Sequence, residues 1–148
     1  LPIRRRHLPA NTTIDARDVP SFCDMYDRGD MLVMPRKFCG LCLPAQEALA
    51  CGMPVLMTDV SPNNEILPPD LLVPATKTHE VMTRAMIGIH EADPVVVAER
   101  IDWLYEHPER FAELSAWAGE WAIAHSWDAL RPLYEATLTG VWPAESVA

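Results

Sequence analysis

The chain is predicted to fold as an α/β domain, with a Rossmann-like parallel sheet between flanking helices. Residues 31–34, 55–57 and 71–73 form continuous apolar runs, without the alternation of a strand that is exposed on one face. Such runs are typical of parallel strands covered on both faces. Between the first two runs, a segment that begins at Pro44 and closes at Gly52 is predicted to be helical. The order strand, helix, strand predicts a βαβ unit with a short crossover.

Size and composition limit the class of protein. With 148 residues, the chain is expected to form one domain with its own core. Its 49% hydrophobic and 22% charged residues are typical of a folded protein. No apolar run reaches the ~18 residues of a membrane span, and the N-terminal segment lacks the apolar centre of a secretory signal. We therefore expect a cytoplasmic protein. The net charge of −9 argues against nucleic acid as the main partner.

Further helices are predicted on both sides of this unit. One begins at Val19 to Ser21, with Pro20 in its first turn, and ends at Gly29. Its predicted apolar face comprises Phe22, Met25 and Tyr26. Downstream, helices are predicted over residues 94–106 and 108–124, and Ser126 is expected to cap a third. Their apolar stripes are interpreted as core or as an inter-domain surface. They comprise Val97, Ile101, Leu104, Tyr105, Phe111, Leu114, Ala118, Trp121, Trp127, Leu130, Tyr134 and Leu138.

The segment 78–93 fits two structures. Its β-branched and methionine residues allow a hairpin, whereas Met82, Met86 and Ile89 also fit the stripe of a helix. We predict that this segment is extended.

The loop over residues 35–44, between the first strand and the helix, is the main candidate binding segment. Amides at a helix start are unpaired and lie at the positive end of the helix dipole, so they attract phosphate. Gly40 allows a ligand to approach the backbone closely, and Arg36 and Lys37 add positive charge. Glu47 is placed to accept hydrogen bonds from vicinal hydroxyls, as in a ribose. The loop therefore favours a nucleotide or sugar phosphate, the alternative being an ordinary loop beside a solvated acidic helix face.

The four cysteines allow three interpretations. Cys39 and Cys42 form a CxxC pair, but only Cys23 and Cys51, at irregular spacing, are left to complete a zinc site. The pair precedes a predicted helix start at Pro44, as a thioredoxin-like redox pair would. We favour the third interpretation, reduced thiols in a cytosolic protein.

A set of motif residues runs in order through residues 30–65. The set comprises Asp30, Pro35, Gly40, Leu43, Pro44, Glu47, Ala48, Ala50, Cys51, Gly52, Pro54, Val55, Thr58 and Glu65. The segments LVP at 72–74, WLYEHPER at 103–110 and the residues around 121–127 continue the pattern. Together they resemble the C-terminal, donor-binding domain of retaining GT-B glycosyltransferases of family 4 (glycosyl transferases group 1). The resemblance covers nearly the whole chain.

The resemblance implies a site for a nucleotide diphosphate sugar, which is the substrate, with no metal and no cofactor. Glu47 stands at the position that holds the donor ribose. The other donor-binding residues implied are Lys37, Gly40, Leu41, Cys42, Leu43 and Glu65. The catalytic position of the family, its first motif glutamate, is occupied here by Cys39. Cys42 replaces the second loop glycine, and Arg36 replaces a serine.

Two functions follow from this pattern. In the first, residues 1–148 are the donor-binding half of a glycosyltransferase, inactive alone because the N-terminal acceptor domain, or a subunit supplying it, is absent. In the second, the substituted loop marks a non-catalytic module that acts in partner binding or as a homo-oligomer.

Overall fold

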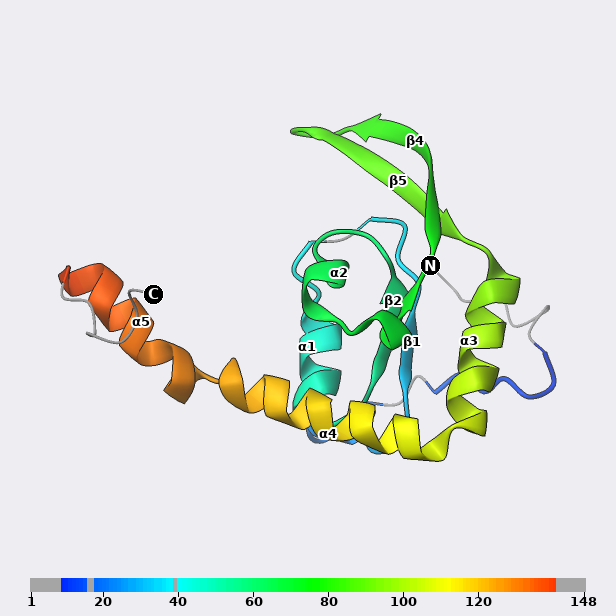
Figure 1. Ribbon diagram of the computed structural model, residues 1–148, viewed down its shortest axis with the longest axis horizontal. Coiled ribbons are helices and arrows are strands. Elements are labelled where there is room, and N and C mark those ends of the chain that lie inside the picture. Colours follow the sequence, from blue (N-terminus) through cyan, green and yellow to red (C-terminus); the bar gives the residue numbers. More distant parts are fainter. Residues whose placement is uncertain (1–8, 16–17, 39, 141–148) are drawn as a thin grey trace.

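The computed structural model describes residues 9–15, 18–38 and 40–140. Its centre is a parallel sheet in the order β1 (Leu32–Met34), β2 (Val55–Thr58) and β3 (Leu72–Val73) (Figure 1). Leu32 lies opposite Val55 in the register of β1 and β2. The predicted parallel α/β architecture is therefore confirmed, and the three strands lie within the three apolar runs or one residue beyond them.

Helices cover the sheet on both sides. Helix α1 (Leu43–Ala50) links β1 to β2, and α3 (Pro94–Glu106) stands on the other side of the sheet (Figure 1). Helix α4 (Pro108–Ala124) packs against α1 and passes the amino end of β2, where Ser115 Oγ donates to Gly52 O at 2.5 Å. No helix in the described ranges is long and apolar enough to cross a membrane.

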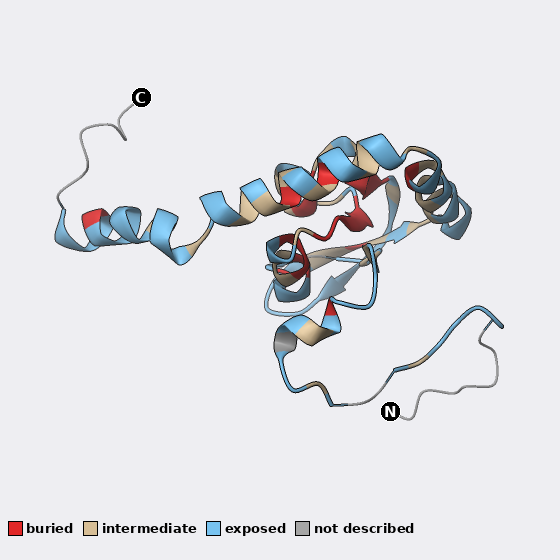
Figure 2. Ribbon diagram, turned by 90° about the horizontal axis from the view of Figure 1, so that it is seen from below, coloured by how far each residue is buried: buried red, intermediate tan, exposed pale blue. Residues whose placement is uncertain are grey.

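The core lies where the sheet, α1 and α4 meet (Figure 2). Strand β2 is buried along its whole length because it has a strand on each side. Leu104 of α3 and Leu114 and Ala118 of α4 are buried as predicted, so these stripes are core. Tyr105 was expected in the same stripe, but it is 87% exposed, because it follows Leu104 on the outer side of α3.

The segment predicted as extended forms an antiparallel hairpin of β4 (Ala75–Met82) and β5 (Met86–Ala92). This prediction is confirmed. The hairpin projects beyond the end of the sheet at which β1 and β2 finish (Figure 1). Its base is joined to the loop after β1, since His90 N donates to Lys37 O at 2.6 Å and Lys37 Nζ forms an ion pair with Glu91.

The helix predicted up to Gly29 is wrong in length. A single 3₁₀ turn, η2 (Phe22–Met25), takes its place, and Ser21 N donates to Asp24 Oδ2 at 3.2 Å at its start. Met25 is 52% exposed, so the predicted apolar face is only partly buried and a longer helix has little to stabilise it. Tyr26, directly after the turn, is buried.

The last helix, α5 (Trp127–Thr139), begins as predicted, because Ser126 Oγ accepts a hydrogen bond from Ala129 N at 3.3 Å. Its aromatic stripe is not core: Trp127 and Tyr134 are 64% and 54% exposed. Figure 2 shows that most of α5 is exposed. An inter-domain surface on α5 stays a prediction.

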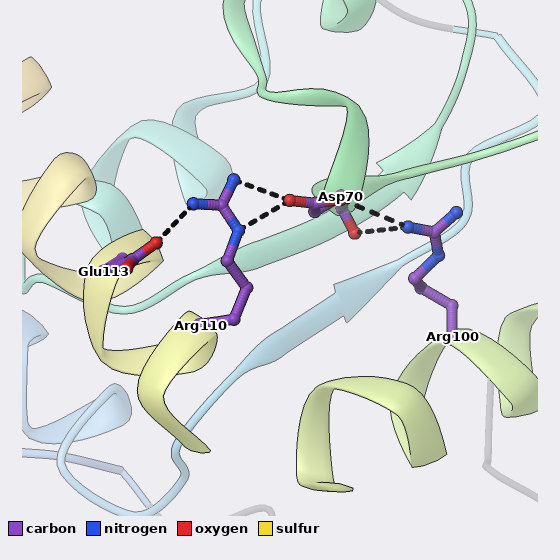
Figure 3. Close-up of polar contacts among 4 residues, drawn as sticks. All are labelled: Asp70, Arg100, Arg110 and Glu113. Carbon is purple, nitrogen blue, oxygen red and sulfur yellow. Dashed lines mark hydrogen bonds and ion pairs between the residues drawn. The ribbon is translucent and has the colours of Figure 1, made fainter. Parts of the chain in front are cut away.

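An ion-pair network joins the loop before β3 to two helices (Figure 3). Asp70 lies in the 3₁₀ turn η3 (Pro69–Leu71). Its Oδ2 accepts from Arg110 Nε of α4 at 2.8 Å, and its Oδ1 lies 3.7 Å from Arg100 Nη1 of α3. Arg110 Nη1 also donates to Glu113 Oε2 at 2.6 Å.

Replacing Asp70 with asparagine is expected to lower the melting temperature, because one carboxylate then no longer joins α3 and α4 to the sheet. The loss should shrink at high salt, since these groups are partly exposed and their attraction is screened. Thermal unfolding at low and high salt measures both effects. Glu113→Gln is the matched control, because Glu113 forms its ion pair with Arg110 inside α4; an equal loss in both variants would contradict a joining role for Asp70.

Candidate functional site

The candidate site lies at the carboxyl ends of β1 and β2, where open α/β sheets bind ligands. The loop after β1 leads into α1, and the loop after β2 leads into α2 (Asn63–Ile66). Thr58 Oγ1 donates to Arg36 O at 2.7 Å, and the buried Asn63 side chain donates to Thr58 O at 3.0 Å. These bonds join the two loops and hold this edge of the sheet in one arrangement.

The start of α1 differs from the sequence expectation in one respect. Pro44 has no N–H, and the N–H groups of Ala45 and Gln46 both donate to Cys42 O, at 3.1 and 3.2 Å. The helix start therefore offers a ligand fewer amides than the sequence pattern suggests. The dipole of α1 still favours an anion at this end, and any amide contacts would come mainly from the preceding loop.

Glu47 lies about one turn into α1 and is half-buried. Tyr26 OH donates to Glu47 Oε2 at 2.7 Å, and the same hydroxyl lies 3.4 Å from Pro44 O. Burial, followed by the hydrogen bond to Glu47 and the negative charge of Glu47, raises the pKa of Tyr26 to about 12. Tyr26 is therefore a neutral hydrogen-bond donor at physiological pH.

Tyr26 is the residue that sequence reasoning missed. The sequence pattern assigned it only to the apolar face of a helix, whereas its hydroxyl contacts the predicted ligand-binding carboxylate. The two residues are 21 positions apart. No local spacing connects them, so only the fold brings them together.

The loop residues predicted to bind the donor divide into two groups. Leu41 and Leu43 are 77% and 59% exposed, and Gly40 is exposed as well. Cys42 is 6% exposed, and its Sγ lies 3.5 Å from Met34 Sδ. The thiol that replaces the second loop glycine therefore points into the core and leaves the outer side of the loop open.

A small cavity of about 30 Å³ lies under this loop, between α1 and α2. It is lined by Gly40, Leu41, Cys42, Ala45, Gln46, Leu49, Met57, Pro62, Asn63, Ile66, Leu67 and Trp121. This space is about the size of one water molecule and is too small to hold a nucleotide.

Lys37 lies beside a larger hollow of about 420 Å³ between the loop, the hairpin and α3. It is lined by Pro35, Lys37, His90, Glu91, Ala92, Pro94 and Val97. The ion pair with Glu91 engages the Lys37 ammonium, and it lowers the pKa of Glu91. His90 Nδ1 is buried and has no partner among the described residues. The hairpin thus contributes residues of β5 to the hollow beside the loop after β1.

Glu65 lies on α2, after the neighbouring strand. Its Oε1 accepts from Ser61 Oγ at 2.5 Å, and beside it Asn64 Nδ2 donates to Asp59 Oδ1 at 2.9 Å. These contacts hold Glu65 to its own loop, and among the described residues no hydrogen bond or ion pair connects it to Glu47. A role for Glu65 in donor binding stays a prediction.

Cys39, the position of the family's first motif glutamate, lies outside the described residues. The three described cysteines are free thiols. Burial, together with nearby Cys23 and Asp27, raises the pKa of the Cys51 thiol, which makes it a poorer nucleophile at neutral pH. In the described part of the chain, no three His, Cys, Asp or Glu side chains converge as a metal site would require.

A family model described as "Glycosyl transferases group 1" matches residues 8–107, which is more than half of the chain. The matched region includes β1, α1, β2, the loops after both strands, and the hairpin. Helices α4 and α5 lie outside it, so the resemblance noted around residues 121–127 stays a prediction. Comparisons with curated proteins and with solved structures found no match. Because the matched region contains the whole sheet and the candidate site, this chain belongs to the glycosyl transferases group 1 family.

Proposed function

We propose that this chain is the donor-binding part of a glycosyltransferase and that it binds a nucleoside diphosphate sugar along residues 37–47. The observation that carries the proposal is the half-buried Glu47 carboxylate, which Tyr26 holds beside a helix start that favours anions. Membership of the glycosyl transferases group 1 family supports the class of reaction. The ligand is a substrate, and neither a metal nor a cofactor takes part in the proposal.

Each part of the site has a role in this proposal. Glu47 accepts hydrogen bonds from the ribose hydroxyls, because an ionised carboxylate is purely an acceptor. The backbone of Gly40 to Leu43, with the dipole of α1, holds the sugar and the diphosphate. Lys37 adds a positive charge at the edge of the loop. Glu65 would approach the donor from the loop after β2.

The reaction proposed is transfer with retention of configuration at the anomeric carbon. The bond between that carbon and the diphosphate oxygen breaks, and an acceptor hydroxyl oxygen bonds to the carbon. The acceptor proton leaves with the nucleoside diphosphate, whose developing charge the loop and the helix dipole stabilise. The acceptor is proposed to be held by a second domain or subunit, so this chain alone should not turn over.

The substitution at Cys39 limits which donor fits. A thiol accepts only weak hydrogen bonds, whereas a carboxylate at this position would accept strong ones from sugar hydroxyls. The donor sugar would therefore be recognised mainly by the loop backbone.

A second candidate function is a non-catalytic module that binds a partner or a second copy of the chain. The observation that favours it is the exposed apolar stripe on α5, where Trp127, Tyr134 and Leu138 are 64%, 54% and 85% exposed. This function predicts self-association or partner binding without affinity for nucleotides.

Thermal unfolding with UDP, ADP, GDP and their sugar derivatives separates the two functions. A ligand that binds only the folded state at ~100-fold excess over its Kd adds roughly 2.7 kcal/mol of stability. A rise in melting temperature with one of these nucleotides would support the donor site and identify the base. No rise with any of them, in a chain that self-associates, would contradict the donor site and favour the module.

A further inference from the structure

We propose that Tyr26 is a positioning residue for the nucleotide site, because its hydroxyl orients the Glu47 carboxylate toward the ribose of a bound nucleoside diphosphate. This inference rests on the proposed role of Glu47 and extends it to a residue outside the βαβ unit. Tyr26 would not touch the ligand. It would act through Glu47 alone.

Tyr26 is anchored well enough to set the position of another side chain. It is only 8% exposed, and it belongs to the buried core cluster that also contains Ala48 and Leu49 of α1. Its hydroxyl therefore reaches Glu47 from a fixed ring. The 2.7 Å bond to Glu47 Oε2 removes rotamer freedom from a long side chain before any ligand arrives. A site organised in advance loses less entropy when the ligand binds.

The bond leaves Glu47 able to bind a diol. A carboxylate offers about four lone-pair sites on two oxygens, and Tyr26 occupies one of them. The remaining sites suit the two hydroxyls of a ribose, which are donors, and repel a phosphate, which is negatively charged. The pair therefore predicts recognition of the ribose itself, and hence discrimination against a 2′-deoxy sugar.

The test compares each of UDP, ADP and GDP with its 2′-deoxy counterpart by calorimetric titration of the whole chain. For the base that the wild-type chain binds, Tyr26→Phe should bind the ribonucleotide up to about tenfold more weakly, because the released Glu47 side chain must then be ordered when the ligand binds. Affinity for the 2′-deoxy nucleotide should fall by less, because that sugar keeps only one of the two hydroxyls that Glu47 would bind. Tyr105→Phe is the matched control, because Tyr105 is 87% exposed and should alter neither value.

The outcomes distinguish a positioning role from a structural one. Equal weakening of both nucleotides in Tyr26→Phe, or no weakening of either, would overturn the positioning role, while loss of binding in Glu47→Ala would leave the donor site standing. A wild-type chain that binds none of the three nucleotides would overturn both. Should Tyr26→Phe fail to fold, Glu47→Asp replaces it, since the shorter side chain draws the carboxylate away from Tyr26. Preserved ribose preference in Glu47→Asp would equally overturn the inference.

Discussion

Replacing Glu47 with alanine is expected to abolish nucleoside diphosphate binding while the chain stays folded. The substitution removes the acceptor for the ribose hydroxyls, and each hydrogen bond to a charged group contributes about 1.5–3 kcal/mol. Loss of two such bonds should lower the affinity by more than about a hundredfold. The fold should persist because alanine favours a helix, and losing the bond from the Tyr26 hydroxyl to Glu47 costs only about 1–3 kcal/mol. Calorimetric titration measures the affinity, and circular dichroism confirms the fold.

The matched control for this variant is Glu120→Ala. It removes the same charge from an exposed position on α4, outside the segment 37–47 that is proposed to bind the ligand. Its affinity for nucleotides should equal that of the wild-type chain. Unchanged affinity in Glu47→Ala would contradict the assignment of Glu47, and equal losses in both variants would show a general effect of charge.

Leu114→Ala is expected to produce a large loss of stability, about 2–5 kcal/mol in the free energy of unfolding. Leu114 is 1% exposed on α4 and lies in the core cluster that α4 forms with α1. The truncation removes buried methyl groups and leaves a cavity that the surrounding helices can only partly fill. Denaturant unfolding measures the change.

Leu138→Ala makes the same substitution on α5, where the side chain is 85% exposed. Its effect on the free energy of unfolding should stay within about 0.5 kcal/mol. A loss in Leu138→Ala as large as that in Leu114→Ala would show that α5 is covered in solution. Such a result would favour the interaction module over the donor site.

The local elements were predictable because their signals are local. Strands β2 and β3 are buried along their length, and β1 is partly exposed at Val33, but each strand lies in an uninterrupted apolar run that identified it without knowledge of its neighbours. Pro44 and Gly52 identified the ends of α1, and Ser126 identified the start of α5. The extended segment over 78–93 was identified from its β-branched and methionine residues, although its composition also allowed a helix.

What could not be predicted depends on contacts between distant parts of the chain. The helix expected up to Gly29 shortens to η2 because its apolar face finds nothing to cover Met25. The bond from His90 N to Lys37 O crosses more than fifty residues and joins the hairpin to the site edge. No periodicity in the sequence encodes such a contact.

In the candidate site, too, the local positions of residues were predictable and their contacts with distant residues were not. Lys37 and residues 40–47 lie on one loop and one helix as predicted, since the order of strand and helix fixes their positions. The direction of each side chain was not predictable: Cys42 points into the core, and Glu47 meets Tyr26. The assignment of Cys39 to the position of the family's first motif glutamate stays a prediction.

The most direct measurement is a two-dimensional NMR titration of the isotope-labelled chain with UDP, ADP and GDP, which locates binding residue by residue. The donor site predicts that one of these nucleotides shifts amide signals of residues 40–47, with Tyr26 among the affected residues and α5 unaffected. Signals that do not move at millimolar nucleotide, or that move only on α5, would contradict the claim that this edge of the sheet binds a nucleoside diphosphate.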